Sequence, residues 1–116
     1  MSLSIPDDPA RLADFYRQLL GLEVLLETDD VVALKGAGIL ITAERIAHHV
    51  PPDWPTGPVP KQVHLELAVD DLAAAEAAAL ALGAVRATAQ PCPEEYLVCF
   101  DPAGHPFCLT TQIPAD

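Results

Sequence analysis

Basic residues are scarce in this sequence, and their scarcity argues against two classes of partner. The 116 residues contain 6 Lys and Arg against 17 Asp and Glu, which gives a formal net charge of −11. Nucleic acids and anionic membranes attract basic proteins through their phosphate groups, and an acidic surface repels both. We therefore expect no nucleic-acid partner and no membrane partner. A small-molecule ligand stays compatible with this charge, because a pocket can be locally neutral inside an acidic surface.

Several signatures of location and catalysis are missing as well. No apolar run approaches the roughly 18 residues of a membrane-spanning helix, and residues 1–16 lack the basic and apolar regions of a signal peptide. The three cysteines have no CxxC spacing, which indicates neither a disulfide framework nor a zinc knuckle. Gly-rich phosphate loops, GxSxG and HExxH are also absent. We expect a cytoplasmic protein with reduced thiols.

The chain repeats one pattern of secondary structure. Residues 8–21 and 71–83 each begin with Asp and end with Leu-Gly, as a helix with an N-cap and a glycine stop does. The first segment, DPARLADFYRQLLG, has apolar residues at helical spacing, and the second, DLAAAEAAALALG, is rich in alanine. One strand-like stretch precedes each helix and three follow it. These stretches cover residues 2–5, 22–28, 31–35 and 38–44, and then 61–69, 84–89, 96–100 and 106–111.

This order predicts the α+β class, with two βαβββ modules in a single domain over residues 1–116 and a short, clipped first strand. Module one covers about 1–46 and module two about 61–113. The segment between them, about 47–60, contains five prolines, which cannot join the interior of a sheet. We interpret it as a linker.

Alternation along the strands assigns their faces. His64 and Glu66 share one face of the stretch 61–69, because successive side chains of a strand point to opposite sides. Aligning residues 36–41 with 104–109 extends the two faces to the last strand of each module. The residues expected to face the helices are Ile39, Ile41, Phe107 and Leu109. Those expected on the side of His64 are Leu40, Thr42, Cys108 and Thr110.

The combination of segments resembles the vicinal oxygen chelate superfamily, which includes glyoxalases, bleomycin-resistance proteins and extradiol dioxygenases. The resemblance rests on DPARLADFYRQLLG, QVHLELAVDDLAAAEAAALALGA and FDPAGHPFCL, with VPPDWPTGPVP between the modules. They cover half of the chain, and the ending PFCL is most similar to the glyoxalase-like branch. The resemblance implies that the two sheets curl into an open cup, with helices outside and a small-molecule site inside.

The resemblance also implies where a metal ion would be held. Metal-dependent members typically use two histidines and two glutamates, from the strand before each helix and the last strand of each module. Counting back from the helix caps and aligning the last strands gives Met1, Leu40, His64 and Cys108. Only His64 matches, and Met1 and Leu40 cannot ligate a hard or borderline cation. We therefore expect no metal ion and no other cofactor.

His64 and Glu66 are the candidate catalytic residues. Histidine titrates near neutrality, and a neighbouring carboxylate could orient it or raise its pKa. The two residues could equally form a solvated pair on an open face. Cys108 could be a nucleophile that His64 activates, or it could pack as a small hydrophobe.

Trp54, the sole tryptophan, stands in the proline-rich linker. A large apolar ring is costly in water, so we expect it to pack inward, either as a lid that stacks on a ligand or as a staple for the linker. The residues expected to line the ligand site are Trp54, Cys108, Leu40, Thr42 and Thr110.

Two functions follow from these features. The first is a metal-independent, glyoxalase-like enzyme that acts on a small organic molecule, with His64 as acid or base and Glu66 as its partner. The second is a non-catalytic binding or sequestering protein of the bleomycin-resistance kind, which uses the same cup without chemistry. We also expect a homodimer, because the clipped first strand leaves a sheet edge that another chain can cover.

Overall fold

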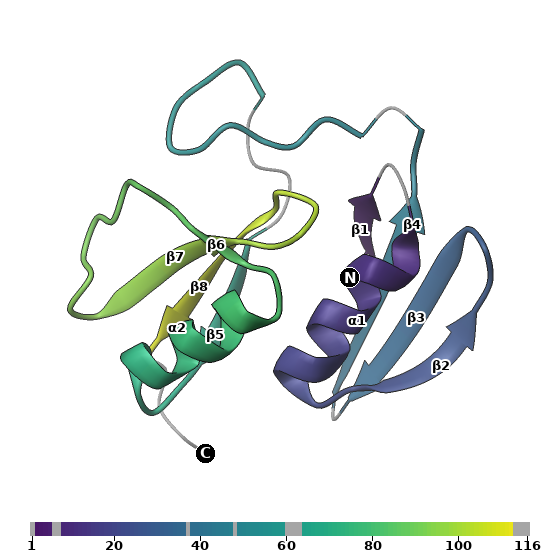
Figure 1. Ribbon diagram of the computed structural model, residues 1–116, viewed down its shortest axis with the longest axis horizontal. Coiled ribbons are helices and arrows are strands. Elements are labelled where there is room, and N and C mark those ends of the chain that lie inside the picture. The colour runs from purple at the N-terminus through teal and green to yellow at the C-terminus, as the bar shows by residue number, and fades with distance from the viewer. Residues whose placement is uncertain (1, 6–7, 37, 48, 60–63, 113–116) are drawn as a thin grey trace. The chain divides into compact units, whose positions relative to one another are not determined.

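The computed structural model describes residues 2–5, 8–36, 38–47, 49–59 and 64–112. The chain forms two compact units, residues 1–50 and 51–116 (Figure 1). Within the described ranges, each unit has one four-stranded sheet and one helix. The predicted α+β class and the two βαβββ modules are therefore confirmed. The boundary between the units falls inside the predicted linker, so residues 51–59 belong to the second unit.

The first unit builds its sheet in the strand order β1-β4-β3-β2. Strand β1 is parallel to β4, and the other neighbours are antiparallel. The short first strand agrees with the prediction. The elements are β1 (Ser2–Ile5), α1 (Pro9–Leu20), β2 (Glu23–Glu27), β3 (Val31–Gly36) and β4 (Ile39–Arg45).

Helix α1 begins and ends where its sequence predicts. The Asp8 carboxylate accepts a hydrogen bond from the Ala10 backbone N–H at 3.0 Å, and Pro9 follows in the first turn, where its missing N–H costs nothing. Gly21 ends the helix in the left-handed conformation, with φ of 66°, and donates its N–H to the Arg17 carbonyl. The buried helix residues are Pro9, Leu12, Ala13, Phe15 and Tyr16.

Alternate residues of strands β1 and β4 are buried. Leu3 and Ile5 of β1 and Ile41 of β4 are almost fully buried. Leu40, which directly precedes Ile41 and points to the opposite face, is 46% exposed. Ile39 was expected to face the helix with Ile41, yet it is exposed. It is the first residue of β4, where the hairpin turns, and this position leaves it open to solvent.

The second unit repeats the arrangement in the strand order β5-β8-β7-β6. Strand β5 is parallel to β8, and the remaining pairs are antiparallel. The Asp71 carboxylate caps the helix by accepting a hydrogen bond from the Ala74 N–H at 3.1 Å. The elements are β5 (Leu65–Ala68), α2 (Leu72–Ala81), β6 (Val85–Arg86), β7 (Tyr96–Phe100) and β8 (Pro106–Thr110).

Strand β6 is shorter than the predicted stretch 84–89, because a side chain takes over part of its role. Strand pairing with β7 ends at Arg86, although the Ala87 N–H still donates to the Val98 carbonyl at 3.0 Å. The Gln90 amide then donates to the carbonyls of Ala87 and Val98, and its oxygen accepts from the Val98 N–H. These bonds satisfy the edge of β7 where a longer strand was predicted.

Helices α1 and α2, the helices of the described ranges, are too short to cross a membrane. That the two sheets form one cup stays a prediction, as does the single-domain organisation.

Candidate functional site

Strand β8 brings the candidate residues together. It is buried along its whole length and lies between β5 and β7. Cys108 is paired with Glu66 of β5 on one side and with Val98 of β7 on the other. Paired residues of neighbouring strands point to the same side of a sheet. Glu66, Cys108 and Val98 therefore share one face of the second sheet.

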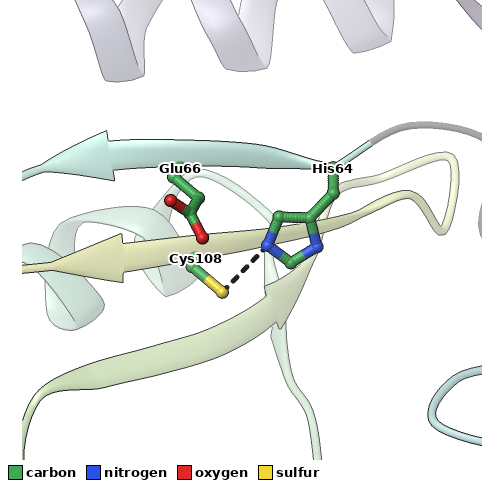
Figure 2. A group of neighbouring side chains, drawn as sticks. All are labelled: His64, Glu66 and Cys108. Atoms are coloured by element: carbon green, nitrogen blue, oxygen red, sulfur yellow. Dashed lines mark hydrogen bonds between the residues drawn. The ribbon is translucent and has the colours of Figure 1, made fainter.

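His64 lies directly before β5 and joins this face. Its Nε2 atom is 3.1 Å from the Cys108 Sγ atom, a hydrogen-bond contact. Figure 2 shows His64, Glu66 and Cys108 side by side, with their polar atoms turned toward one another. One ligand atom from each of the three lies within 4.8 Å of the others. The predicted meeting of His64 and Cys108 on one face is confirmed.

The His64–Cys108 contact has two protonation forms. With a neutral thiol, the S–H donates to an unprotonated Nε2. With a protonated imidazole, the Nε2–H donates to a thiolate. The same contact can therefore hold the proton at either atom, which is the arrangement that acid–base chemistry at this site requires.

A pocket of about 570 Å³ opens over this cluster. Its volume lies within the range of about 300–1,000 Å³ that is typical of small-molecule sites. A few polar groups converge on it beside aromatic and apolar walls, as such sites do. The residues that line it are Trp54, His64, Glu66, Tyr96, Val98 and Cys108.

Trp54 reaches the pocket from the proline-rich segment. Its half-buried ring packs against the buried cluster of Ala87, Val98 and Cys108. The ring also meets Phe100 edge to face, with centroids 6.5 Å apart and an interplanar angle of 71°. Trp54 thus lies on the pocket face of the sheet, where one part of the ring packs and another lines the cavity.

The segment that carries Trp54 is held at two places. The Asp53 N–H donates to the Val59 carbonyl, and the Asp53 carboxylate accepts from the Val59 N–H at 3.1 Å, so the loop is closed across its base. At the start of the segment, Pro51 packs on Gly104 so closely that a Cβ atom at Gly104 would lie 2.7 Å from the Pro51 Cβ atom. Both contacts restrict where Trp54 can lie.

Two pocket residues, Tyr96 and Val98, were not singled out from the sequence. The alternation in YLVCF places them on the same face of β7. Which face this is depends on the hairpin register, in which Val98 pairs with Cys108. That register was the signal that could have found them, once Cys108 was a candidate.

Thr110 was predicted to line the ligand site, and its hydroxyl has structural partners. The side chain is buried, donates to the Glu95 carbonyl at 3.4 Å and accepts from the Gln112 N–H at 3.0 Å. It shares β8 with Cys108 but is not among the residues that line this pocket. Its role in binding stays a prediction.

The other predicted site residues belong to the first unit. Leu40 is exposed and Thr42 half-buried on β4, and their part in a shared cup stays a prediction, while Met1 lies outside the described residues. Counting back from the helix caps does not match the strand faces of the two units. Leu3 and Glu66 both stand five residues before their caps, yet Leu3 is buried and Glu66 exposed. Residues at the same distance from the two helix caps therefore lie on opposite faces of their sheets, and the count from the caps is one residue off.

The donor atoms do not fit the four-ligand set that the superfamily implies. Leu40 offers no donor, and the three donors that do cluster, from His64, Glu66 and Cys108, come from one module. Two ligands of one tetrahedral zinc ion, with Zn–N of ~2.0–2.1 Å and Zn–S of ~2.3 Å, would lie about 3.5 Å apart. The observed N···S distance of 3.1 Å is that of a direct hydrogen bond.

Cys99 offers a contrast with Cys108. It precedes Phe100 on β7, is fully buried, and pairs with Phe107 on the face opposite to Cys108. Burial, reinforced by the negative charge of Glu76, raises the pKa of the Cys99 thiol to about 11. The nucleophilic form of cysteine is the thiolate, so Cys99 should be unreactive at neutral pH.

We expect iodoacetamide at pH 8 to leave Cys99 unlabelled in the native protein and to label it fully in urea. Peptide mass spectrometry after timed quenching measures both rates. Equal rates with and without urea would contradict this assignment of Cys99 to the core.

Comparison with known proteins gives a consistent result. The family model of the glyoxalase-like domain matches residues 3–110. No curated protein was found to match the sequence. Among solved structures, a glyoxalase/bleomycin resistance protein/dioxygenase family enzyme from Burkholderia phytofirmans is similar over 94% of this chain and 93% of that chain, with 16% identity and a TM-score of 0.70.

Two further solved structures show the same fold. One is a mutant of the fosfomycin resistance protein FosX from Listeria monocytogenes, complexed with Mn(II) and 1S,2S-dihydroxypropylphosphonic acid. It covers 97% of this chain and 90% of its own, with 13% identity and a TM-score of 0.74. The other is a lactoylglutathione lyase from Agrobacterium tumefaciens, which covers 95% of this chain and 89% of its own, with 20% identity and a TM-score of 0.62.

Proposed function

Since the chain belongs to the family of glyoxalase-like domains, in the vicinal oxygen chelate superfamily, we propose that it binds a small organic molecule in the pocket of its second unit and acts on it through His64 without a metal ion. The observation that carries this proposal is the contact between His64 and Cys108 inside a pocket walled by Trp54 and Tyr96. It places a group that exchanges protons near neutrality beside surfaces that hold an organic ligand.

In this proposal His64 transfers a proton and Glu66 assists it. The imidazole lies at the pocket wall, where it can meet a ligand directly. The carboxylate of Glu66 is its close neighbour, since one polar atom from each of His64, Glu66 and Cys108 lies within 4.8 Å of the others. Trp54 and Tyr96 supply ring faces against which the apolar part of the ligand can pack. The ligand's reacting atom would then lie at the polar end of the pocket.

We expect the purified protein to carry far less than one divalent metal ion per chain. His64 and Cys108 are hydrogen-bonded to each other, and Leu40 in the first unit has no atom that could ligate a metal ion. Elemental analysis after separate exchange into Zn²⁺, Ni²⁺, Mn²⁺ and Fe²⁺ tests this, with His64→Ala as the matched control. One tightly held ion per chain that is lost in His64→Ala would restore a metalloenzyme.

The second candidate function is binding without chemistry, and the aromatic wall of the pocket favours it. Trp54, Tyr96 and Val98 would suffice to hold an apolar ligand, whatever His64 does. A thermal-shift screen that includes fosfomycin and lactoylglutathione, chosen from the names of the similar proteins, separates the two functions. A ligand that is converted by the wild type and not by His64→Gln supports the enzyme. A ligand recovered unchanged from both proteins supports the binding protein.

The expected homodimer and cytoplasmic location belong to the same proposal. The short strand β1 at the edge of the first sheet is the feature that invites a second chain. Light scattering on the purified protein measures the oligomeric state directly.

A further inference from the structure

We propose that Cys108 is a nucleophilic thiol, with His64 as its base, and that it forms a covalent thioether with small electrophiles that enter the pocket. The inference rests on the proposed function in one respect, which is that the pocket admits a small organic molecule. It adds a reactive atom and a ligand class to that function.

The surroundings of Cys108 differ from those of a structural cysteine. An activated nucleophile has a base within hydrogen-bond reach. His64 Nε2 lies 3.1 Å from the thiol sulfur, and one polar atom from each of His64, Glu66 and Cys108 lies within 4.8 Å of the others (Figure 2). The remaining requirement is access, and Cys108 lines the pocket despite its low overall exposure.

The protein contains internal controls for this chemistry. Cys99 neighbours Cys108 across the β7–β8 pair but lies in the core on the opposite face. Cys92 is half-buried in the loop before β7. Neither shows a contact with a histidine among the hydrogen bonds of the described residues. A comparison of the three thiols within one chain therefore shows whether Cys108 is the most reactive, and a substitution at His64 tests the effect of the base.

The pocket favours conjugated carbonyl compounds as electrophiles. Such molecules are small and planar, so they can lie against the rings of Trp54 and Tyr96. Their electrophilic carbon needs a sulfur nucleophile and no leaving group. Their carbonyl oxygen can accept a hydrogen bond from a protonated His64.

The chemical step balances without any co-reactant. The thiol proton passes from Sγ to His64 Nε2, and the sulfur electron pair forms a bond to the β-carbon of the α,β-unsaturated carbonyl. The carbon–carbon π pair moves toward the carbonyl to give an enolate. The proton on His64 then passes to the α-carbon. The net result is addition of S–H across the double bond, with a thioether at Cys108 and a neutral imidazole.

Acrylamide, the smallest convenient conjugate acceptor, tests the proposal on the full-length native protein. We expect Cys108 to be modified about tenfold or more faster than Cys92 at pH 7.5, although Cys92 is the more exposed thiol. Peptide mass spectrometry gives the rate at each cysteine in one sample. If Cys108 reacts no faster than Cys92, the proposal is overturned, and this comparison needs no variant.

A substitution at His64 tests the role of the base. His64→Gln keeps a hydrogen-bonding side chain but cannot take a proton, so we expect the Cys108 rate to fall about tenfold while the Cys92 rate stays unchanged. His49→Gln, in the first unit, is the matched control and should leave both rates unchanged. A Cys108 rate within twofold of wild type in His64→Gln, with the fold intact by circular dichroism, would overturn the assignment of the base.

Titration of Cys108→Ser with fosfomycin and with lactoylglutathione, followed by Trp54 emission, separates this proposal from the proposed function. If a ligand binds but acrylamide modifies Cys108 of the wild type no faster than Cys92, the assignment of Cys108 as a nucleophile is overturned and the proposed function stands. A fast Cys108 in a protein that binds no ligand supports the nucleophile and counts against the proposed function.

Discussion

Replacing Trp54 with alanine is expected to weaken the binding of a pocket ligand about tenfold or more, which corresponds to ~1.4 kcal/mol. The ring lines the pocket and is held on the sheet by Phe100 and by the cluster around Val98. Its removal takes away both contact area and the wall that excludes water. Isothermal titration calorimetry with a ligand from the thermal-shift screen measures the change.

Trp54→Phe is the matched control for this substitution. It keeps an aromatic ring and should retain most of the affinity. The Trp54→Ala protein should stay folded, because the ring is half-buried and lies outside the strands. An affinity within twofold of wild type in Trp54→Ala would mean that the ring only fixes the segment 51–59 to the sheet.

Replacing Phe107 with alanine is expected to lower the free energy of unfolding by about 3–5 kcal/mol. The side chain is fully buried on β8, and its pairing partners are Leu65 of β5 and Cys99 of β7. Truncation would leave a cavity at the centre of the second sheet, in addition to the lost burial of the ring. Urea denaturation followed by circular dichroism measures the loss.

Leu25→Ala is the control for the Phe107 substitution. Leu25 is a large apolar residue of β2 that is 58% exposed, so we expect a change within about 0.5 kcal/mol. A similar loss of stability in both variants would contradict the assignment of Phe107 to the core. The contrast also bears on the site, because Phe107 and Cys108 are neighbours on one strand.

The two faces of β8 explain how the proposed chemistry is positioned. Phe107 and Leu109 anchor the strand in the core, and Cys108 between them is turned toward the pocket. Hydrogen bonding to β5 and β7 on both sides fixes the strand. A reactive sulfur on such a strand is held in place before a ligand arrives, which reduces the cost of orienting it.

The sequence alone determined the features that depend on local pattern. The caps at Asp8, Gly21 and Asp71 marked the ends of the helices, because each cap satisfies backbone groups only a few residues away. Alternation along the last strands placed Phe107 in the core and Cys108 on the other face. The alignment of the two modules, together with the family resemblance, predicted that His64 and Cys108 would meet.

Only the tertiary structure decided the features that depend on distant contacts. The Gln90 side chain ends β6 early by bonding to Val98, eight residues away, and strand propensity carries no sign of it. The hairpin register of β7 and β8 places Tyr96 in the pocket. Trp54 lines the pocket because the proline-rich segment packs on the sheet, and the sequence of that segment does not predict which way its side chains point. The His64–Cys108 separation of 3.1 Å was likewise beyond the sequence. A repeating pattern specifies which side of a strand a residue occupies, whereas the distance between two side chains depends on how whole strands pair and pack.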